Sequence, residues 1–208
     1  MRAGELRVYP GGEPDEERRP TPKQRRVAER VRALMDELGL DLGDPDLSET
    51  PLRVARAYDE MLAGRGGEPR MRTFPNTEGY SEMVALIDIP FYSICAHHLL
   101  PFFGAAHVAY LPGDRIVGLS KLARVVEAYA RRPQTQERMT EQIIGAIVRQ
   151  LRPKGAMVIL QARHLCMEMR GANKPGVITT TSAINGAFVE DRVRQELLAL
   201  LPSRPSAA

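Results

Sequence analysis

Two cysteines, each with a histidine close by in the sequence, are the residues of this chain best suited to chemistry. Cys95 is followed by His97 and His98, and His164 stands two residues before Cys166. Thiolate and imidazole are ligands that zinc favours, and a catalytic zinc site combines three protein ligands with one open position for water. If Cys95, His98 and Cys166 converge, they would form such a site. A disulfide or simple burial is the alternative use of the two thiols, and we favour metal.

The two remaining histidines of these motifs are candidates for proton transfer. His97 cannot easily point in the same direction as its neighbour His98, which leaves its imidazole free for proton transfer. If the second segment is a strand, His164 and Cys166 project from the same face. Zinc lowers the pKa of a bound water toward neutrality, and two imidazoles beside it could shuttle protons. These groups are suited to hydrolysing a C–N bond in a polarised substrate. The alternative for the first motif is a core histidine bonded to backbone, and for the second a buried cysteine with an incidental histidine.

Basic residues at helical spacing are candidates for binding a polyphosphate. The candidates, with a nearby hydroxyl, are Arg53, Arg56, Lys121, Arg124, Arg170 and Ser120. Arginine binds phosphate with bidentate geometry, and a helix start adds backbone N–H groups. For any single pair, a solvated helix face is the alternative. The sequence has no Walker-type glycine-rich loop, which excludes a P-loop enzyme.

A carboxylate lies at the expected start of another helix. Glu137 follows two amides in the segment 134–138. A buried carboxylate can accept two hydrogen bonds from the N1–H and exocyclic amino edge that guanine presents. The alternative is a favourable interaction of Glu137 with the helix dipole.

Composition and charge narrow the class of protein. The chain is 43% hydrophobic with a formal net charge of +3, and its sequence pI is about 9.0. The positive excess suits an anionic small molecule or a nucleic acid, but no coherent basic stripe of a nucleic-acid binder is present. No apolar run approaches the roughly 20 residues of a membrane span, and the first 20 residues have no signal-peptide core. We therefore expect a cytoplasmic protein with neither a nucleic-acid nor a membrane partner.

The elements that must position these residues are a block of helices followed by mixed strands and helices. Apolar periodicity predicts helices at 22–38, 51–63, 120–131, 135–151 and 190–200, and strands at 82–90, 105–111, 156–162 and 177–184. This order favours the α+β class with antiparallel pairing. We expect a mobile tail at 1–20, one domain at 21–201 and a frayed C-terminus at 202–208. Within the domain, 21–66 would be helical and 78–201 would contain the sheet.

Six ordered blocks make residues 22–190 resemble GTP cyclohydrolase I. The blocks span residues 50–56, 95–104, 118–124, 132–138, 164–171 and 179–182. The resemblance implies a tunnelling fold (T-fold): an antiparallel four-stranded sheet with paired helices and an N-terminal helical extension. It also implies assembly into a homodecamer with active sites between subunits. The implied reaction is zinc-dependent hydrolysis of GTP at C8, release of formate and rearrangement to 7,8-dihydroneopterin triphosphate, the first step of pteridine and tetrahydrofolate biosynthesis.

The resemblance also assigns roles to residues. Zinc would be held by Cys95, His98 and Cys166, and protons would be transferred by His97 and His164. Glu137 would read the guanine edge, and Gln136 would sit by the ribose or base. The remaining substrate-binding residues would be Arg53, Arg56, Leu119, Ser120, Lys121, Arg124 and Arg170.

The chain departs from the family pattern at three places. The family usually has an acidic residue at the position of Ala96 and a carboxylate at that of Gln161, and valine is common in the loop that here reads Ala172 and Asn173. None of these changes removes a predicted ligand or proton carrier. Losing two carboxylates could still alter local pKa values and a later step of the reaction. The alternatives are therefore a pathway-specific paralogue with another end product, or a scaffold that binds a nucleotide or pterin without catalysis.

Overall fold

The computed structural model describes residues 19–64 and 67–202, which fall into two compact units, Met1–Asp59 and Glu60–Ala208. Most of the expected tail at 1–20 and of the expected frayed end at 202–208 lies outside the described residues. The single domain expected at 21–201 stays a prediction. None of the described helices is long and apolar enough to cross a membrane.

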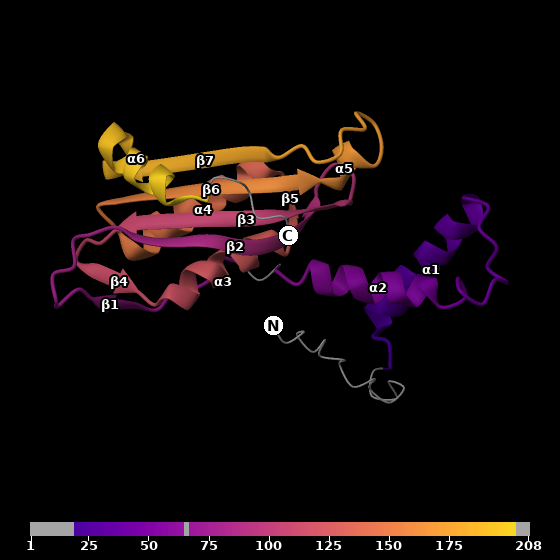
Figure 1. The fold of residues 1–208 in the computed structure, drawn as a ribbon. Coiled ribbons are helices and arrows are strands. Elements are labelled where there is room, and N and C mark those ends of the chain that lie inside the picture. The colour runs from indigo at the N-terminus through magenta and orange to yellow at the C-terminus, as the bar shows by residue number, and fades with distance from the viewer. Residues whose placement is uncertain (1–18, 65–66, 203–208) are drawn as a thin grey trace, which may run out of the picture. The chain divides into compact units, whose positions relative to one another are not determined.

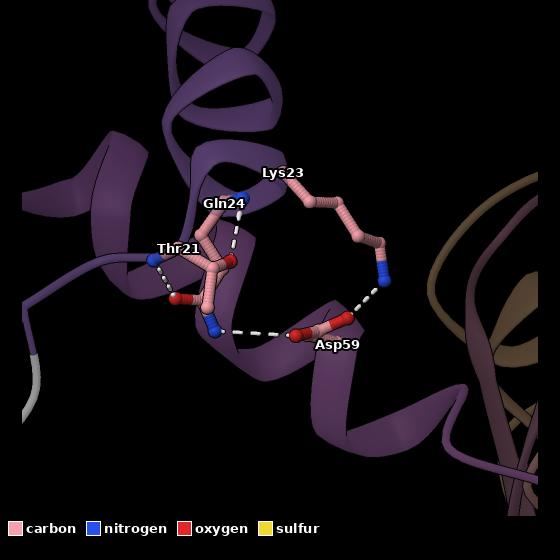
Figure 2. Close-up of polar contacts among 4 residues, drawn as sticks. All are labelled: Thr21, Lys23, Gln24 and Asp59. Carbon is pink, nitrogen blue, oxygen red and sulfur yellow. Dashed lines mark hydrogen bonds and ion pairs between the residues drawn. The ribbon is translucent and has the colours of Figure 1, made fainter.

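The N-terminal unit contains helix α1 (Pro22–Glu37) and helix α2 (Thr50–Met61), whose residues up to Asp59 belong to it. Thr21 caps α1: its hydroxyl accepts from Gln24 N at 3.2 Å, and Gln24 Oε1 accepts from Thr21 N at 2.9 Å. Figure 2 shows how this cap continues to α2, where Asp59 accepts from Gln24 Nε2 at 3.2 Å and pairs with Lys23. Both predicted helices are confirmed, and the capping box explains where α1 begins.

A five-stranded sheet in the order β5-β2-β3-β6-β7 forms the second unit's framework (Figure 1). Its long strands are antiparallel to their neighbours, and the short β5 runs parallel to β2. The strands are β2 (Val84–Cys95), β3 (Pro101–Leu111), β5 (Pro133–Gln134), β6 (Gly155–His164) and β7 (Thr179–Gly186). A separate two-stranded sheet pairs β1 (Thr73–Pro75) with β4 (Arg115–Val117).

Two helices pack against one face of this sheet: α3 (Leu119–Ala130) against β2, and α4 (Gln136–Leu151) against β6 and β7. Buried apolar residues recur along α4 at four-residue steps, as expected of a helix with one core-facing stripe: Met139, Ile143, Ile147 and Leu151. The other face carries a smaller cluster that includes residues of η1 (Ala187–Val189) and α6 (Asp191–Leu200). The α+β class and the antiparallel sheet with paired helices are therefore confirmed.

The expected strand at 82–90 is too short, because β2 continues to Cys95. Proline normally ends or weakens a strand because it lacks an N–H, and it is tolerated where one edge of the strand is open. Pro90 pairs with Ala105 of β3, whereas in the part of the chain that the structure describes the second edge of β2 is paired only at Ile94 and Cys95, by β5. The longer strand matters because it carries Cys95 to the end of the sheet where β6 also ends.

Candidate metal centre and active site

Cys95 and His98 are brought together by a tight turn at the end of β2. Leu99 N donates to Cys95 O at 2.9 Å, and Ala96 N donates to Gln134 O of β5 at 2.8 Å. This turn places His98 Nδ1 3.7 Å from Cys95 Sγ. The expectation that a cysteine and a histidine three residues apart can face one ion from a turn is met by this geometry.

Cys166 reaches the same place from the end of β6, but not as the sequence suggested. The expectation that His164 and Cys166 project from one face of a strand is wrong, because β6 ends at His164 and the chain turns into the short helix α5 (Leu165–Glu168). The helical turn, closed by Met169 N donating to Leu165 O at 3.1 Å, directs Cys166 toward β2. Its Sγ lies 3.9 Å from Cys95 Sγ, and neither thiol is in a disulfide.

Helix α5 is anchored by a residue to which the sequence pattern assigned no role. Glu168 is buried, and its two carboxylate oxygens accept from Arg163 Nε at 2.8 Å and Arg163 Nη2 at 2.6 Å. The bond from Arg163 holds the pKa of Glu168 below its usual value. The guanidinium also lies over the Phe103 ring, 5.7 Å from its centroid. The five-residue spacing of Arg163 and Glu168 fits neither a strand face nor one helix face, so no sequence pattern indicated this pair.

The three donors have the separations of a metal site. Cys95, His98 and Cys166 each offer one ligand atom, and these atoms all lie within 4.8 Å of one another. Tetrahedral zinc, with bonds of about 2.3 Å to sulfur and about 2.0 Å to nitrogen, separates two sulfurs by about 3.8 Å and sulfur from nitrogen by about 3.5 Å. The observed separations of 3.9 Å and 3.7 Å match these edges closely. Burial, followed by the neighbouring Cys95, raises the pKa of the Cys166 thiol, and a bound cation would favour the thiolate form of Cys166 that ligates metal.

Two further predicted residues surround this donor group. Arg170 is exposed just after α5, and its Nη1 lies 3.4 Å from His98 Nε2. His97 is exposed, and its ring is nearly perpendicular to that of His98, at 83° with centroids 6.2 Å apart. His97 therefore stands beside the donor group without joining it.

His164 lies half-buried at the end of β6 with its ring held on two sides. It stacks on Phe102 of β3, with ring centroids 4.7 Å apart and an interplanar angle of 3°. Its Nε2 lies 2.8 Å from Gln136 Oε1. Burial lowers the pKa of His164 below its ordinary value, opposed by the negative charges of Glu137 and Glu168. The sequence analysis assigned no role to Phe102, although this residue lies within one of the blocks that resemble the family.

Gln161, one of the departures from the family pattern, does not face this site. Side chains alternate between the faces of a strand, so Gln161 and His164, three residues apart on β6, lie on opposite faces. Gln161 Oε1 instead lies 3.4 Å from Nε2 of His107, a fully buried histidine of β3 that the sequence left without a role. Asp88 N donates to the other ring nitrogen, His107 Nδ1, at 3.2 Å.

Apart from Arg170, the predicted phosphate-binding residues lie in two places. Leu119, Ser120 and Lys121 form the first turn of α3 and Arg124 follows on the next, with only Lys121 partly covered. The N-cap of α3 is Gly118, which has no side chain that could cap the first N–H groups of the helix.

Arg53 and Arg56 lie on α2 within the N-terminal unit. Arg53 is exposed and pairs with Glu49 at 2.7 Å, and Arg56 is half-buried. Glu137 is exposed in the first turn of α4, close enough to His164 to act on its pKa.

Comparison with known proteins agrees with this geometry. A family model described as GTP cyclohydrolase I matches residues 27–202. Proteins named GTP cyclohydrolase 1 are 50% identical in Mycolicibacterium gilvum over 182 residues (86% of this chain, 90% of that protein) and 48% identical in Aquifex aeolicus over 177 residues (85% and 95%). One from Carboxydothermus hydrogenoformans is 50% identical over 176 residues (82% and 91%). A solved structure of an archaeosine synthase QueF-Like in the apo form has a TM-score of 0.41 and 17% identity, covering 50% of this chain and 94% of that one.

Proposed function

Because this chain belongs to the GTP cyclohydrolase I family, we propose that it hydrolyses GTP at C8, releases formate and rearranges the product to 7,8-dihydroneopterin triphosphate. The observation that carries the proposal is the convergence of Cys95, His98 and Cys166 within 4.8 Å beside the oriented ring of His164. A donor set of two thiolates and one imidazole with an adjacent proton carrier suits hydrolysis of a C–N bond.

The proposed cofactor is zinc, held by Cys95 Sγ, His98 Nδ1 and Cys166 Sγ. When bound, zinc supplies Lewis acidity and lowers the pKa of water. The chain's own residues do the rest of the positioning. The turn after β2 holds Cys95 and His98, and the Arg163–Glu168 pair holds the segment that carries Cys166. Groups that hold the ligands in this way support metal binding without contacting the ion.

The proposed roles of the remaining site residues concern binding and proton transfer. His97 and His164 exchange protons with the reacting substrate, and Glu137 accepts hydrogen bonds from the guanine edge. Arg170 lies beside His98 at the metal group, where a phosphate-binding cation is well placed to orient the nucleotide. The other proposed substrate contacts are Arg53, Arg56, Leu119, Ser120, Lys121 and Arg124.

We include in the proposal a homo-oligomer, a decamer with active sites between subunits. Within the described residues, β7 is paired on one edge only, and β2 is paired on its second edge only at Ile94 and Cys95. Open strand edges favour pairing with another chain. The proposal also places the protein in the cytoplasm, where thiols stay reduced and available to a metal. Native mass spectrometry would give the subunit number, and a stable monomer would contradict this part.

Product identification tests the proposed reaction. Purified zinc-loaded protein is incubated with GTP, and the products are separated and identified by fluorescence and mass. Formate and 7,8-dihydroneopterin triphosphate are expected. A reaction that ends at the opened imidazole ring would contradict the full reaction and support a paralogue with another end product. Ala96, which provides no carboxylate, is the reason for testing this alternative. Unchanged GTP would contradict the proposal and support a binding scaffold.

A further inference from the structure

Gln136, the first residue of α4, has its side-chain amide enclosed by acceptors. Gln136 is 2% exposed, and its Nε2 lies 3.0 Å from Leu160 O, 2.9 Å from Thr179 O and 3.1 Å from Thr181 Oγ1. Carbonyl oxygens only accept hydrogen bonds, so the amide nitrogen must be the atom that faces them. An amide turned by 180° would set its oxygen against two carbonyl oxygens in a buried place, at a cost in unmade hydrogen bonds. The orientation of the Gln136 amide is therefore fixed by the backbone of β6 and β7.

This orientation determines which nitrogen of His164 carries the proton. Gln136 Oε1 lies 2.8 Å from His164 Nε2, and an amide oxygen only accepts. The neutral ring must therefore carry its hydrogen on Nε2 and leave a lone pair on Nδ1. Among the described residues, Nδ1 has no protein hydrogen-bond partner, and no fully buried side-chain N or O atom there lacks a partner. Nδ1 is consequently accessible from outside the protein.

A pair of hydroxyls completes the support of the amide. Thr140 Oγ1 donates to Gln136 O at 2.8 Å, so its single hydrogen is used. The 2.7 Å contact between Thr140 Oγ1 and Thr181 Oγ1 then requires Thr181 to be the donor. Thr181 Oγ1 keeps its lone pairs for the Gln136 amide hydrogen. Each hydroxyl hydrogen in this group therefore has one consistent assignment, and the two amide hydrogens of Gln136 are shared among three acceptors, two carbonyls and Thr181 Oγ1.

We propose that Gln136 is a positioning residue, which holds the ring of His164 in one orientation, with its hydrogen on Nε2 and a lone pair on Nδ1. Phe102 fixes the plane of the ring by stacking, and Gln136 fixes its rotation within that plane. The consequence for turnover rests on the proposed function, whereas the assignment of the hydrogen does not.

The assignment is tested directly by solid-state NMR of zinc-loaded protein labelled with nitrogen-15 in its histidine rings. The signals of His164 are those missing from His164→Ala. In the wild-type protein we expect a protonated Nε2 and an unprotonated Nδ1. Gln136→Met keeps the length of the side chain and removes the amide, so we expect a mixture of both tautomers. A wild-type ring with its hydrogen on Nδ1, or a Gln136→Met ring that stays wholly in the Nε2–H form, would overturn the proposal.

Kinetics of graded variants separate positioning from a general loss of structure. Gln136→Met should lower kcat up to about 10²-fold, as expected for a displaced catalytic group, with KM changed less than about twofold. Thr181→Val, which removes one acceptor of three, should lower kcat less, and Thr181→Ser should restore it. Thr180→Val is the matched control, because Thr180 is exposed and alternates to the other face of β7. A KM effect as large as the kcat effect, or no recovery in Thr181→Ser, would contradict the positioning role.

The tautomer measurement and the turnover measurement test the two proposals independently. The tautomer is measured without GTP, so a His164 ring in the Nε2–H form in a protein that leaves GTP unchanged would refute the proposed reaction while supporting the hydrogen assignment. Normal formate release with the hydrogen on Nδ1 would refute the positioning proposal alone.

Discussion

Two histidine–glutamine pairs lie on opposite faces of the same sheet, and they differ in what their second ring nitrogen does. On the face with α3 and α4, His164 bonds Gln136 at 2.8 Å through Nε2 and keeps Nδ1 accessible. On the other face, His107 bonds Gln161 at 3.4 Å through Nε2, and its Nδ1 accepts from Asp88 N. A ring with both nitrogens occupied inside the protein can only hold structure together, whereas a ring with one open nitrogen can exchange a proton.

The position of each pair along its strands reinforces the difference. His107 lies in the middle of β3 and is fully buried, next to the irregularity of β2 between Leu86 and Ile89, where Asp88 has a positive φ of 56°. Its bond to Asp88 N satisfies a backbone donor that this irregularity removes from regular pairing. His164 instead ends β6, directly before the segment that carries Cys166.

The largest expected effect is on turnover, in His164→Ala. Removing a general acid or base lowers the rate by about 10²–10⁴-fold, while the metal ligands stay intact. We therefore expect formate release to fall by this factor with an unchanged zinc content, measured by atomic absorption and single-turnover kinetics. Near-normal formate release would remove His164 from proton transfer.

The matched change on the other face, His107→Leu, should show the opposite pattern. It removes the two hydrogen bonds that the His107 ring makes with Asp88 N and the Gln161 amide, and each such bond contributes about 0.5–1.5 kcal/mol. We expect a loss of that size in the free energy of unfolding, read from denaturant titration, with kcat per folded protein unchanged. A large loss of kcat with full stability would abolish the contrast between the two histidines.

A smaller effect is expected for Glu168→Gln, which weakens the anchor of α5 without touching a ligand atom. Arg163 would lose its charged partner, and the segment carrying Cys166 would be held less firmly. Loss of a residue that supports a metal ligand lowers metal affinity by about tenfold or more, so we expect a loss near that lower limit in competition with a chelator. Arg163→Lys should show a similar loss of metal affinity, because lysine cannot make both hydrogen bonds to Glu168. Unchanged metal affinity in both variants would show that the Arg163–Glu168 pair does not support metal binding.

The smallest effect is expected for Gln161→Glu, which introduces the carboxylate that the resemblance to the family led us to expect at this position. Because Gln161 faces His107 and not His164, formate release should stay within about twofold of the wild type, as is usual for a change without contact to the reacting groups. A tenfold change in kcat would show that the two faces of the sheet are coupled.

The elements with a clear apolar period could be predicted from the sequence, and those set by contacts between distant segments could not. Helices α1 and α4 have regular stripes and side-chain caps at Thr21 and Thr135, and both were predicted within two residues. β2 was predicted to end at Pro90, because the open edge that tolerates proline is a property of the sheet and not of the strand. Helix α5 was missed because four residues are too few for a period.

The metal ligands could be predicted because cysteines next to histidines are rare in sequences, whereas the residues that hold these ligands and His164 in place could not. Thiols beside imidazoles point to a metal at any separation in the sequence, and the structure brings Cys95 and Cys166 together across 71 positions. Glu168 and Phe102 act through contacts of common residue types, which carry no signal of their own. The substrate contacts, including Arg53 and Arg56, stay predictions.

Zinc content measured together with formate release tests the central claim most directly. Wild-type protein, protein stripped with a chelator and the variant Cys166→Ser are compared at equal concentration with GTP. We expect one zinc ion per chain and formate release in the wild type, neither in the stripped protein nor in Cys166→Ser, and recovery only of the stripped wild type when zinc is returned. Full formate release by metal-free protein, or by Cys166→Ser, would contradict the account.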